Sequence, residues 1–397
     1  MKIPSIPGVR LASVAAGIRY RDRNDLVVCA LPDRTTTAAT YTRNAFCAAP
    51  ITVAREHAAR ARVRYLLINS GNANAGTGPR GLADTRACCT ALADLAGCEP
   101  EQVLPFSTGV IGEYLPLDRI TGCLPRALAQ LDQDGWESAA EAIMTTDTVA
   151  KLGFRKFVVD SREATLVGIA KGAGMIRPNM ATMLAFLATD AAVEKDVLQH
   201  CLTTAVDQSF NCISIDGDTS TNDACVLCAA GTLGNRPIVT LDGPDGNLSK
   251  AVGGLCEELA TAIVRDGEGA TKLVRVEVIS AANATEARIV ADTIAHSPLV
   301  KTALFAADPN WGRILAAVGR AGIADLAIER VHIWLDDCLL VSNGSRDPDY
   351  EEAAGRQVME QDSFSIRVGL GRGKARAQVL TCDLSYDYVR INAEYRT

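Results

Sequence analysis

The sequence predicts an α+β protein in which large mixed or antiparallel sheets are covered by helices. Strand-like apolar runs alternate with segments that carry apolar residues at helical spacing, along all 397 residues. Hydrophobic residues make up 48% of the chain and charged residues 22%, which is enough apolar surface for a large core. No repeat of roughly 20 to 50 residues is visible, so a solenoid is not expected. Layers of sheet and helix fit this pattern best.

Two patterns place the individual elements. Apolar and β-branched runs between turn residues predict strands at 25–31, 63–69, 154–160, 165–170, 183–189, 273–280, 330–340, 364–370, 375–384 and 386–392, with two shorter runs inside 212–229. Apolar residues at helical spacing predict helices at 82–95, 117–131, 194–206, 249–264 and 284–295. Asn310 is a candidate helix cap. The glycine- and proline-rich segment 231–247 is the expected boundary between lobes, and 369–374 is expected to be a hairpin turn rather than a phosphate loop.

The charge and composition exclude several classes of partner. A formal net charge of −7 argues against a nucleic-acid surface, and no apolar run approaches the roughly 20 residues of a membrane helix. The expected setting is the cytoplasm, with a small-molecule partner. The 13 cysteines are odd in number in a long chain, which does not indicate a disulfide framework. Cys225 and Cys228 lie three apart on a strand and point to opposite faces, so no metal site is expected there.

Residues 168–184, GIAKGAGMIRPNMATML, form the most informative stretch. An apolar run passes through Lys171 and two glycines, turns at Pro178-Asn179, and presents Thr182 before a second apolar run. A strand, a close backbone approach and a turn can display a nucleophilic hydroxyl. The alternative is that Ala181-Thr182 simply begins a buried strand, which is the commoner case for these residue types.

A hydroxyl nucleophile needs a base, and histidine is scarce. The four histidines lie in no motif with a serine or cysteine nucleophile, and no G-x-S-x-G elbow is present. A base is available without histidine when the nucleophile is the first residue of a chain, because its own α-amino group accepts the proton. That arrangement requires cleavage between Ala181 and Thr182.

Two further stretches are candidates for binding. In the run 107–112, STGVIG, Gly109 follows the hydroxyl residue Thr108, which suits an oxyanion hole, although turns of this composition are common. The acidic run 216–223, DGDTSTND, can be read as a cation site, but its threonine, serine and asparagine residues favour a turn that satisfies its own hydrogen bonds.

Eight motifs in order resemble the ornithine acetyltransferase family, the arginine-biosynthesis bifunctional glutamate N-acetyltransferases. They are NSGNANAGTG from Asn69, STGVIGEYLPLDRI from Ser107, IMTTDT from Ile143, KGAGMIRPNMATML from Lys171, DGDTSTND from Asp216, DGEGATK from Asp266, DPNWGR from Asp308 and YVRINAEYRT from Tyr388. The resemblance covers nearly the whole chain. It implies an αββα-type sandwich with an N-terminal threonine nucleophile, cleaved into chains 1–181 and 182–397 that form one interleaved folded unit.

The resemblance also implies roles for particular residues. Thr182 is the nucleophile, cleavage falls between Ala181 and Thr182, and Thr108 with Gly109 forms the oxyanion hole. The implied substrate-binding residues are Thr145, Lys171, Thr182, Glu268, Asn392 and Thr397. Thr146 adjoins Thr145 and is the alternative at that position.

The implied reaction is acetyl transfer from N-acetylornithine to glutamate through an acetyl-threonine ester. No cofactor and no metal are implied, although acetyl-CoA is a possible co-substrate, and a heterotetramer of two α and two β chains is expected. One alternative is a self-cleaving aminopeptidase or amidohydrolase of the same architecture, which would hydrolyse instead of transferring. Another is a non-catalytic binding protein on the same scaffold.

Overall fold

The computed structural model describes residues 2–177, 183–242 and 246–394, and it divides into two compact units. The first unit comprises Met1–Asn211 and Asp218–Ile263, and the second comprises Cys212–Gly217 and Val264–Thr397. The expected lobe boundary at 231–247 is therefore misplaced, because this segment lies within the first unit. The described residues of this segment connect β10 (Ala224–Ala229) to α6 (Asn247–Arg265), and both of these elements belong to the same layered structure.

The first unit contains two sheets. The four-stranded sheet has the order β1 (Arg10–Val14), β2 (Leu26–Ala30), β4 (Tyr65–Asn72) and β5 (Val103–Val110). The five-stranded sheet has the order β3 (Thr36–Tyr41), β10, β8 (Leu184–Thr189), β7 (Arg162–Lys171) and β6 (Lys151–Val159). Only the β4–β5 and β10–β8 pairs are parallel. The mixed sheets expected from the sequence are confirmed.

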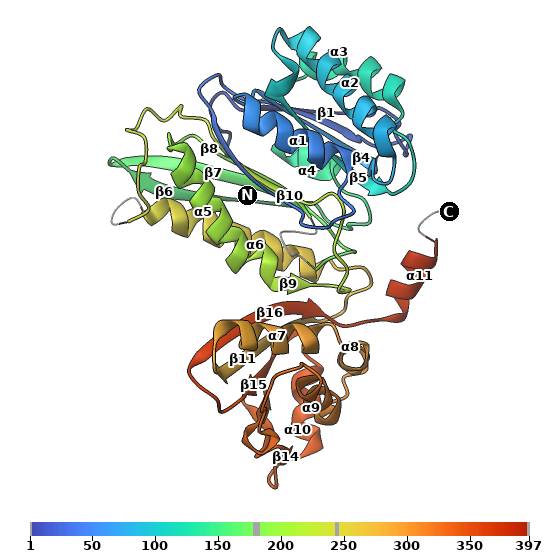
Figure 1. Cartoon of the computed structure of the whole chain (residues 1–397), viewed down its shortest axis with the longest axis vertical. Helices are drawn as coiled ribbons and strands as arrows, with labels where there is room; N and C mark the ends of the chain where they lie inside the picture. Colours follow the sequence, from blue (N-terminus) through green and yellow to red (C-terminus); the bar gives the residue numbers. More distant parts are fainter. Residues whose placement is uncertain (1, 178–182, 243–245, 395–397) are drawn as a thin grey trace. The chain divides into compact units, whose positions relative to one another are not determined.

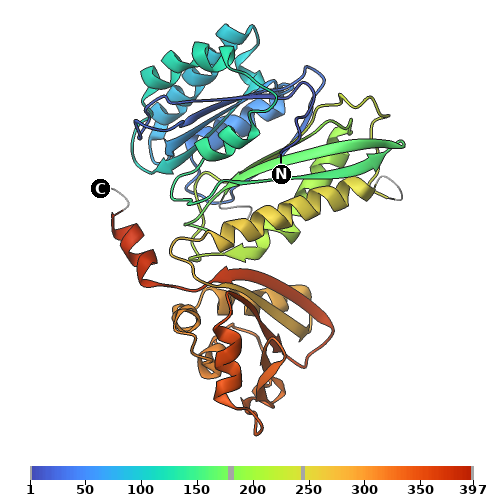
Figure 2. The same ribbon diagram turned by 180° about the vertical axis from the view of Figure 1, so that it is seen from behind.

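Helices cover the outer faces of the two sheets (Figure 1 and Figure 2). α2 (Gly78–Ala96) and α3 (Leu117–Ala129) pack on the four-stranded sheet. α5 (Lys195–Gln208) packs on β3 and β10, and α6 lies on the glycine-lined face of β6 and β7, where a Cβ on Gly168 would lie 3.1 Å from Leu255. α1 (Ala49–Arg60) and α4 (Trp136–Ala142) contribute to the core between the sheets. The layers are αββα, as expected.

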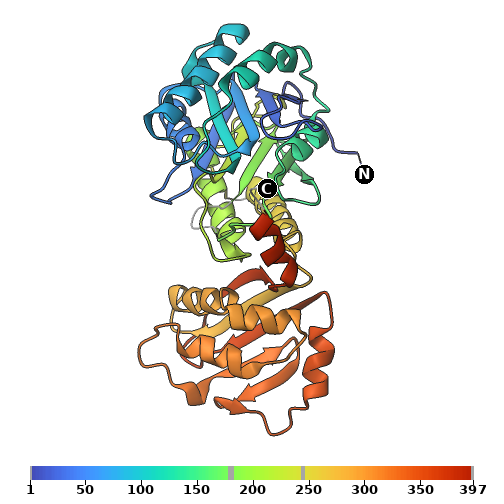
Figure 3. The ribbon, with the colours of Figure 1, turned by 90° about the vertical axis from the view of Figure 1, so that its right-hand side faces the viewer.

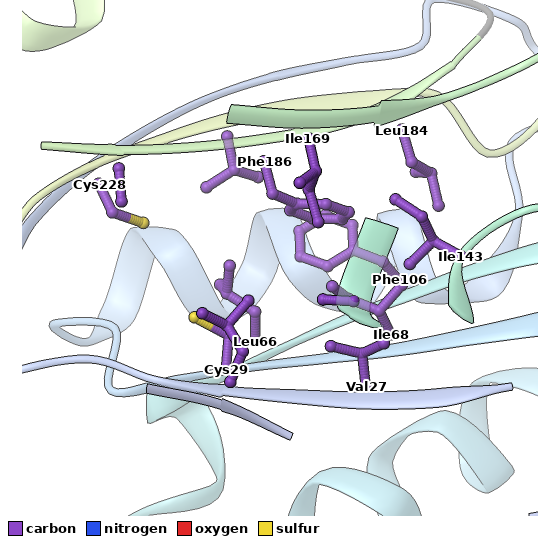
Figure 4. Packing of buried hydrophobic residues seen from close by; sticks show 14 of the residues in the cluster. Val27, Cys29, Leu66, Ile68, Phe106, Ile143, Ile169, Leu184, Phe186 and Cys228 are labelled. Carbon is purple, nitrogen blue, oxygen red and sulfur yellow. The ribbon is translucent and has the colours of Figure 1, made fainter. Parts of the chain in front are cut away.

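Alternating side chains join the two sheets face to face. Phe106 of β5 and Phe186 of β8 meet between them with ring centroids 5.1 Å apart (Figure 4). Cys228 of β10 points into this same core, whereas Cys225 is buried on the other face of the sheet, near Cys256 of α6. The prediction that these two cysteines point to opposite faces of their strand is confirmed. Burial also raises the pKa of the Cys228 thiol to about 12, so it stays neutral.

The second unit is built on a seven-stranded sheet. Its order is β14 (Ser345–Arg346), β13 (Cys338–Ser342), β12 (His332–Leu335), β15 (Ser363–Gly369), β11 (Leu273–Ala281), β16 (Ala375–Cys382) and β9 (Ile213–Ser214). Its helices are α7 (Ala284–Ala295), α8 (Pro298–Phe305), α9 (Trp311–Gly319), α10 (Glu352–Met359) and α11 (Tyr386–Glu394). Helices lie against this sheet (Figure 3). Buried side chains of β11 and of α7 belong to one hydrophobic core. The Asn310 side chain caps α9, as expected, by accepting from the Arg313 amide.

Three local predictions in this unit are wrong. Residues 386–392 form helix α11 instead of a strand, favoured by Asp387 in the first turn and by its ion pair with Arg390. The run 330–340 turns back on itself at Asp336 to give the β12–β13 hairpin. The segment 369–374 is not a hairpin turn, since β11 lies between β15 and β16 in the sheet. Within the described residues, no helix combines the length and apolarity needed to span a membrane.

Candidate active site

The backbone at the end of β5 is fixed by a glycine that no other residue could replace without distortion. Gly109 has φ of +133°, and a Cβ there would lie 2.3 Å from the carbonyl carbon of Gly71 and 2.5 Å from the amide nitrogen of Asn72. Gly71 is its register partner on β4. The close approach holds Thr108 and Gly109, the predicted oxyanion pair, at the end of the four-stranded sheet, where both residues are half-buried.

Buried amide and hydroxyl groups hold this end of the sheet in place. Asn222, just before β10, donates from Nδ2 to the carbonyl oxygens of Ala73 (2.6 Å) and Ser107 (2.9 Å). The Ser107 hydroxyl in turn donates to Asn69 Oδ1 over 2.5 Å. The motifs NSGNANAGTG and DGDTSTND carry these asparagines, so both motifs support the predicted oxyanion pair. Neither Asn69 nor Asn222 was predicted to have a role of its own.

The same asparagine brings the start of β8 to this end of the sandwich. Two residues after Asn222, the amide of Ala224 donates to the Met183 carbonyl over 3.0 Å. β8 then pairs with β7, with Leu184 opposite Lys171. Ala181 and Thr182, the predicted cleavage point and nucleophile, lie outside the described residues. Their described neighbour Met183 is thus held at the end of the sandwich that carries Ser107, Thr108 and Gly109.

Lys171 lies in a buried cluster of polar side chains. Its ammonium group donates to Thr145 Oγ1 over 2.8 Å and lies 3.9 Å from the Asp147 carboxylate. Lys151 Nζ is 2.7 Å from the same carboxylate. Two predicted substrate-binding residues, Thr145 and Lys171, are therefore in direct contact, and Asp147 and Lys151 belong to their surroundings. Asp147 and Lys151 were not predicted as site residues, although the motif IMTTDT contains the aspartate.

Asp147 organises this cluster. Its carboxylate accepts from the backbone amides of Gly172 (2.7 Å) and Thr145 (3.0 Å), and its side chain is fully buried. Burial alone would raise the pKa of Asp147, but the ammonium groups of Lys171 and Lys151 and these hydrogen bonds together hold it well below its ordinary value. The carboxylate is therefore ionised at neutral pH, where it fixes the position of Lys171.

This charge arrangement predicts how Asp147→Asn will behave. The variant keeps the shape of the side chain but removes the charge between two lysines, and we expect a loss of about 3–5 kcal/mol in the free energy of unfolding at pH 7. A carboxyl with a depressed pKa stabilises the fold above its unfolded pKa of about 3.9, and this contribution is lost as the pH falls through the folded pKa. The gap between wild type and variant should therefore narrow below about pH 4 in urea titrations.

Asp190→Asn is the matched control. Asp190 is also buried and accepts from the Thr165 amide over 2.9 Å, but burial raises its pKa and no cation contributes to the shift. Removing this charge should therefore cost less at pH 7 than removing that of Asp147. Equal losses in the two variants, or a gap for Asp147→Asn that is constant with pH, would contradict the assigned role of Asp147.

The second unit brings another predicted pair together. Asn392 Nδ2 of α11 donates to Glu268 Oε2 over 2.7 Å. The turn that carries Glu268 is docked on the start of α11, where Ser385 Oγ donates to the Gly269 carbonyl over 2.6 Å. Gly269 has φ of +68°, and a Cβ there would lie 2.6 Å from the Tyr388 amide nitrogen, so this close contact requires glycine. Thr397 lies outside the described residues.

The acidic run 216–223 forms hydrogen bonds both within itself and to distant segments of the chain. The Asn222 amide donates to Ser220 Oγ over 3.1 Å, and the Thr42 hydroxyl donates to the Ser220 carbonyl over 2.8 Å. Among the residues that the structure describes, no group of three or more histidine, cysteine, aspartate or glutamate side chains is arranged to hold a metal ion. The run is therefore not a turn that satisfies only its own hydrogen bonds, because Ser220 and Asn222 bond to residues of other segments.

These features define an αββα-layered enzyme in which the predicted oxyanion pair lies at one end of the sandwich. The chain belongs to the ArgJ family, whose model matches residues 10–397. It is 58% identical over 398 residues to the arginine biosynthesis bifunctional protein ArgJ of Methylococcus capsulatus, with 100% of this chain and 97% of the relative covered. The protein of the same name from Pseudomonas fluorescens is 51% identical over 393 residues, covering 99% of this chain and 97% of its own.

One solved structure is also similar. The crystal structure of ArgJ from Bacillus halodurans is 41% identical, with a TM-score of 0.51, and the match covers 53% of this chain and 99% of that one. The family expected from the eight motifs is confirmed, and the acetyltransferase interpretation is favoured over the self-cleaving aminopeptidase.

Proposed function

We propose that this chain moves the acetyl group of N-acetylornithine to glutamate, as one step of a cyclic route to arginine. Membership of the ArgJ family supports the pathway, and one observation in the structure supports the chemistry. The Asn222 side chain and the residues that follow it tie the Thr108–Gly109 end of β5 to Met183, the residue next to Thr182. This arrangement suits a threonine ester whose carbonyl oxygen is stabilised by the Thr108 hydroxyl and the Gly109 amide.

The reaction has two halves. In the first half, Thr182 Oγ attacks the acetyl carbonyl carbon while the α-amino group of Thr182 takes the hydroxyl proton. The amide C–N bond then breaks, the proton passes to the departing nitrogen, and ornithine leaves an acetyl-threonine ester. In the second half, the amine of glutamate attacks this ester and Thr182 Oγ regains its proton. One nucleophile thus serves both substrates in ping-pong order.

Recognition of the two amino acids follows from the charges of the assigned residues. N-acetylornithine and glutamate share an α-carboxylate, and we assign it to Lys171 and Thr145, whose ammonium and hydroxyl groups are already in contact. Glu268 and Asn392 bind the ornithine ammonium group, and Thr397 contributes at the end of the chain. Glu268→Gln should then raise KM for N-acetylornithine more than for glutamate in steady-state assays.

Cleavage before Thr182 is part of the proposal. It would leave a first chain of 181 residues and a second of 216 residues. The match to the solved Bacillus halodurans chain covers 99% of that chain but only 53% of this one. The stretch from Thr182 to Thr397 is also slightly more than half of this chain, so the solved chain has about the length of the proposed second chain. We further propose a cytoplasmic heterotetramer of two α and two β chains that requires no cofactor, with acetyl-CoA as an additional acetyl donor.

The test is acetyl transfer in the presence and absence of glutamate. Purified protein incubated with N-acetylornithine and glutamate should form N-acetylglutamate and ornithine in equal amounts, measured by mass spectrometry. Without glutamate, ornithine release should stop near one equivalent per active site. Continuous release of ornithine and acetate without glutamate would indicate a hydrolase and overturn the proposal. A parallel reaction with acetyl-CoA and glutamate tests the second donor.

A further inference from the structure

A cavity of about 810 Å³ lies in the first unit, away from the residues assigned above. It is lined by residues at the start of the edge strand β3, at the end of α1 and at the start of α5. Ala229, the last residue of β10, also lines it, whereas the first residue, Ala224, bonds to Met183. Since β10 rises about 3.3 Å per residue, the cavity is roughly 17 Å from the candidate active site.

The cavity is positively charged in a negatively charged chain. Arg34, Arg60, Arg62 and Lys195 line it, and Glu194 is the one carboxylate in its lining. In the described part of the chain, Arg34, Arg60 and Lys195 form no ion pair. Three cationic side chains around one cavity, within a protein of net charge −7, favour a ligand with several negative charges.

Neutral donors adjoin these cations. α5 is 14 residues long and begins in the lining, and the side chain of its N-cap residue Glu194 forms no capping hydrogen bond. The first-turn amides and the helix dipole are therefore available to an anion. Thr35, which also belongs to the lining, is 1% exposed, and its hydroxyl has no hydrogen-bond partner within the described residues. Guanidinium groups, uncapped amides and hydroxyls are the donors that bind phosphate oxygens.

The wall of the cavity is held by buried hydrogen bonds. Asn235 accepts from the Ala192 amide over 2.8 Å and donates to its carbonyl over 3.1 Å. Gln199 of α5 bonds both backbone groups of Ala39 on β3, each over 3.2 Å. These contacts fix α5 against the edge strand, so the shape of the cavity does not depend on a ligand.

We propose that this cavity binds a small phosphorylated molecule through a diphosphate group. The cavity volume suits a ligand of this size. Donors from α1, α5 and the start of β3 would contact a bound anion from several sides. The site is separate from the acetyl-transfer site, so a bound diphosphate would not contact the reacting threonine. Two sources share this chemistry, free inorganic pyrophosphate and a nucleoside diphosphate.

The test is isothermal titration calorimetry, which measures the Kd of the full chain for inorganic pyrophosphate and for ADP at constant ionic strength. Both probes should bind the wild type. The double variant Arg34→Gln/Arg60→Gln should bind pyrophosphate at least about tenfold more weakly, because it loses two charge-assisted contacts. The matched control Arg10→Gln/Arg21→Gln removes the same charge from exposed arginines outside the cavity and should change the Kd less than about twofold. Tighter binding of ADP would identify a nucleotide as the source, and equal binding would identify the diphosphate alone.

Both double variants should retain acetyl transfer, which shows that they are folded and separates this test from that of the proposed function. If the cavity variant does not fold, Lys195→Gln provides the same comparison with one exposed side chain. The proposal is overturned if neither probe binds the wild type at millimolar concentration. It is equally overturned if the cavity variant and its control weaken pyrophosphate binding to the same extent.

Discussion

Thr182→Ala should yield a single uncut chain with no acetyl-transfer activity, whereas the wild type should separate into chains of 181 and 216 residues on denaturing mass spectrometry. The substitution removes the hydroxyl that attacks the preceding peptide bond and later the acetyl group. Because cleavage also generates the α-amino base, one substitution eliminates both the nucleophile and its proton acceptor. We expect turnover to fall on the order of 10⁴-fold or more.

Thr182→Ser is the matched control. It retains the hydroxyl and loses only a methyl group, so it should still be cleaved and should keep part of the activity. Incubation of the wild type with N-acetylornithine alone should add the mass of one acetyl group to the peptide that begins at Thr182. An intact wild-type chain, or cleavage of Thr182→Ala at the same bond, would be incompatible with the proposed nucleophile.

Much of the fold could be predicted because its signals are local. The run 165–170 is mostly apolar and lies within β7, an interior strand of the five-stranded sheet, and its residues from Leu166 to Ala170 are all buried. Residues 386–392 misled the prediction because tyrosines and isoleucine alternate there with polar residues, although no neighbouring strand is available. The prediction of a hairpin turn at 369–374 was wrong for a related reason. This segment connects β15 and β16, and local composition does not reveal that β11 lies between these two strands in the sheet.

The residues of the candidate site also differ in how far local sequence predicts them. Thr108 and Gly109 could be proposed from two adjacent residues, because a hydroxyl residue followed by glycine itself indicates an oxyanion hole. Asp147 could not be proposed from the sequence, because its role depends on its ion pairs with Lys151 and Lys171. Lys171 reaches Asp147 only because β7 pairs with its neighbouring strands. Asn222 was missed for the same reason, because its two acceptors are 149 and 115 residues away along the chain.

Gly109→Ala is expected to have the second largest effect. The new Cβ would lie 2.3 Å from a backbone atom of Gly71, so the ends of β4 and β5 must separate. The φ of +133° adds strain of about 1–3 kcal/mol for any residue with a side chain. Displacement of the Gly109 amide removes one donor from the forming oxyanion, which should lower kcat by about 10²- to 10³-fold.

Two further variants separate the loss of this donor from strain alone. Gly112→Ala also has a positive φ, +86°, but its Cβ would meet nothing within 4 Å, so it should lose stability and keep most of its kcat. Thr108→Val introduces no such overlap and removes the hydroxyl of the second donor, so it should lower kcat with little change in the free energy of unfolding. If kcat falls in all three variants in proportion to their stability, the end of β5 supports the fold only. A fall confined to Gly109→Ala and Thr108→Val requires that these two residues stabilise the transition state. Gly112→Ala shares the positive φ of Gly109→Ala, and Thr108→Val has neither the positive φ nor the overlap.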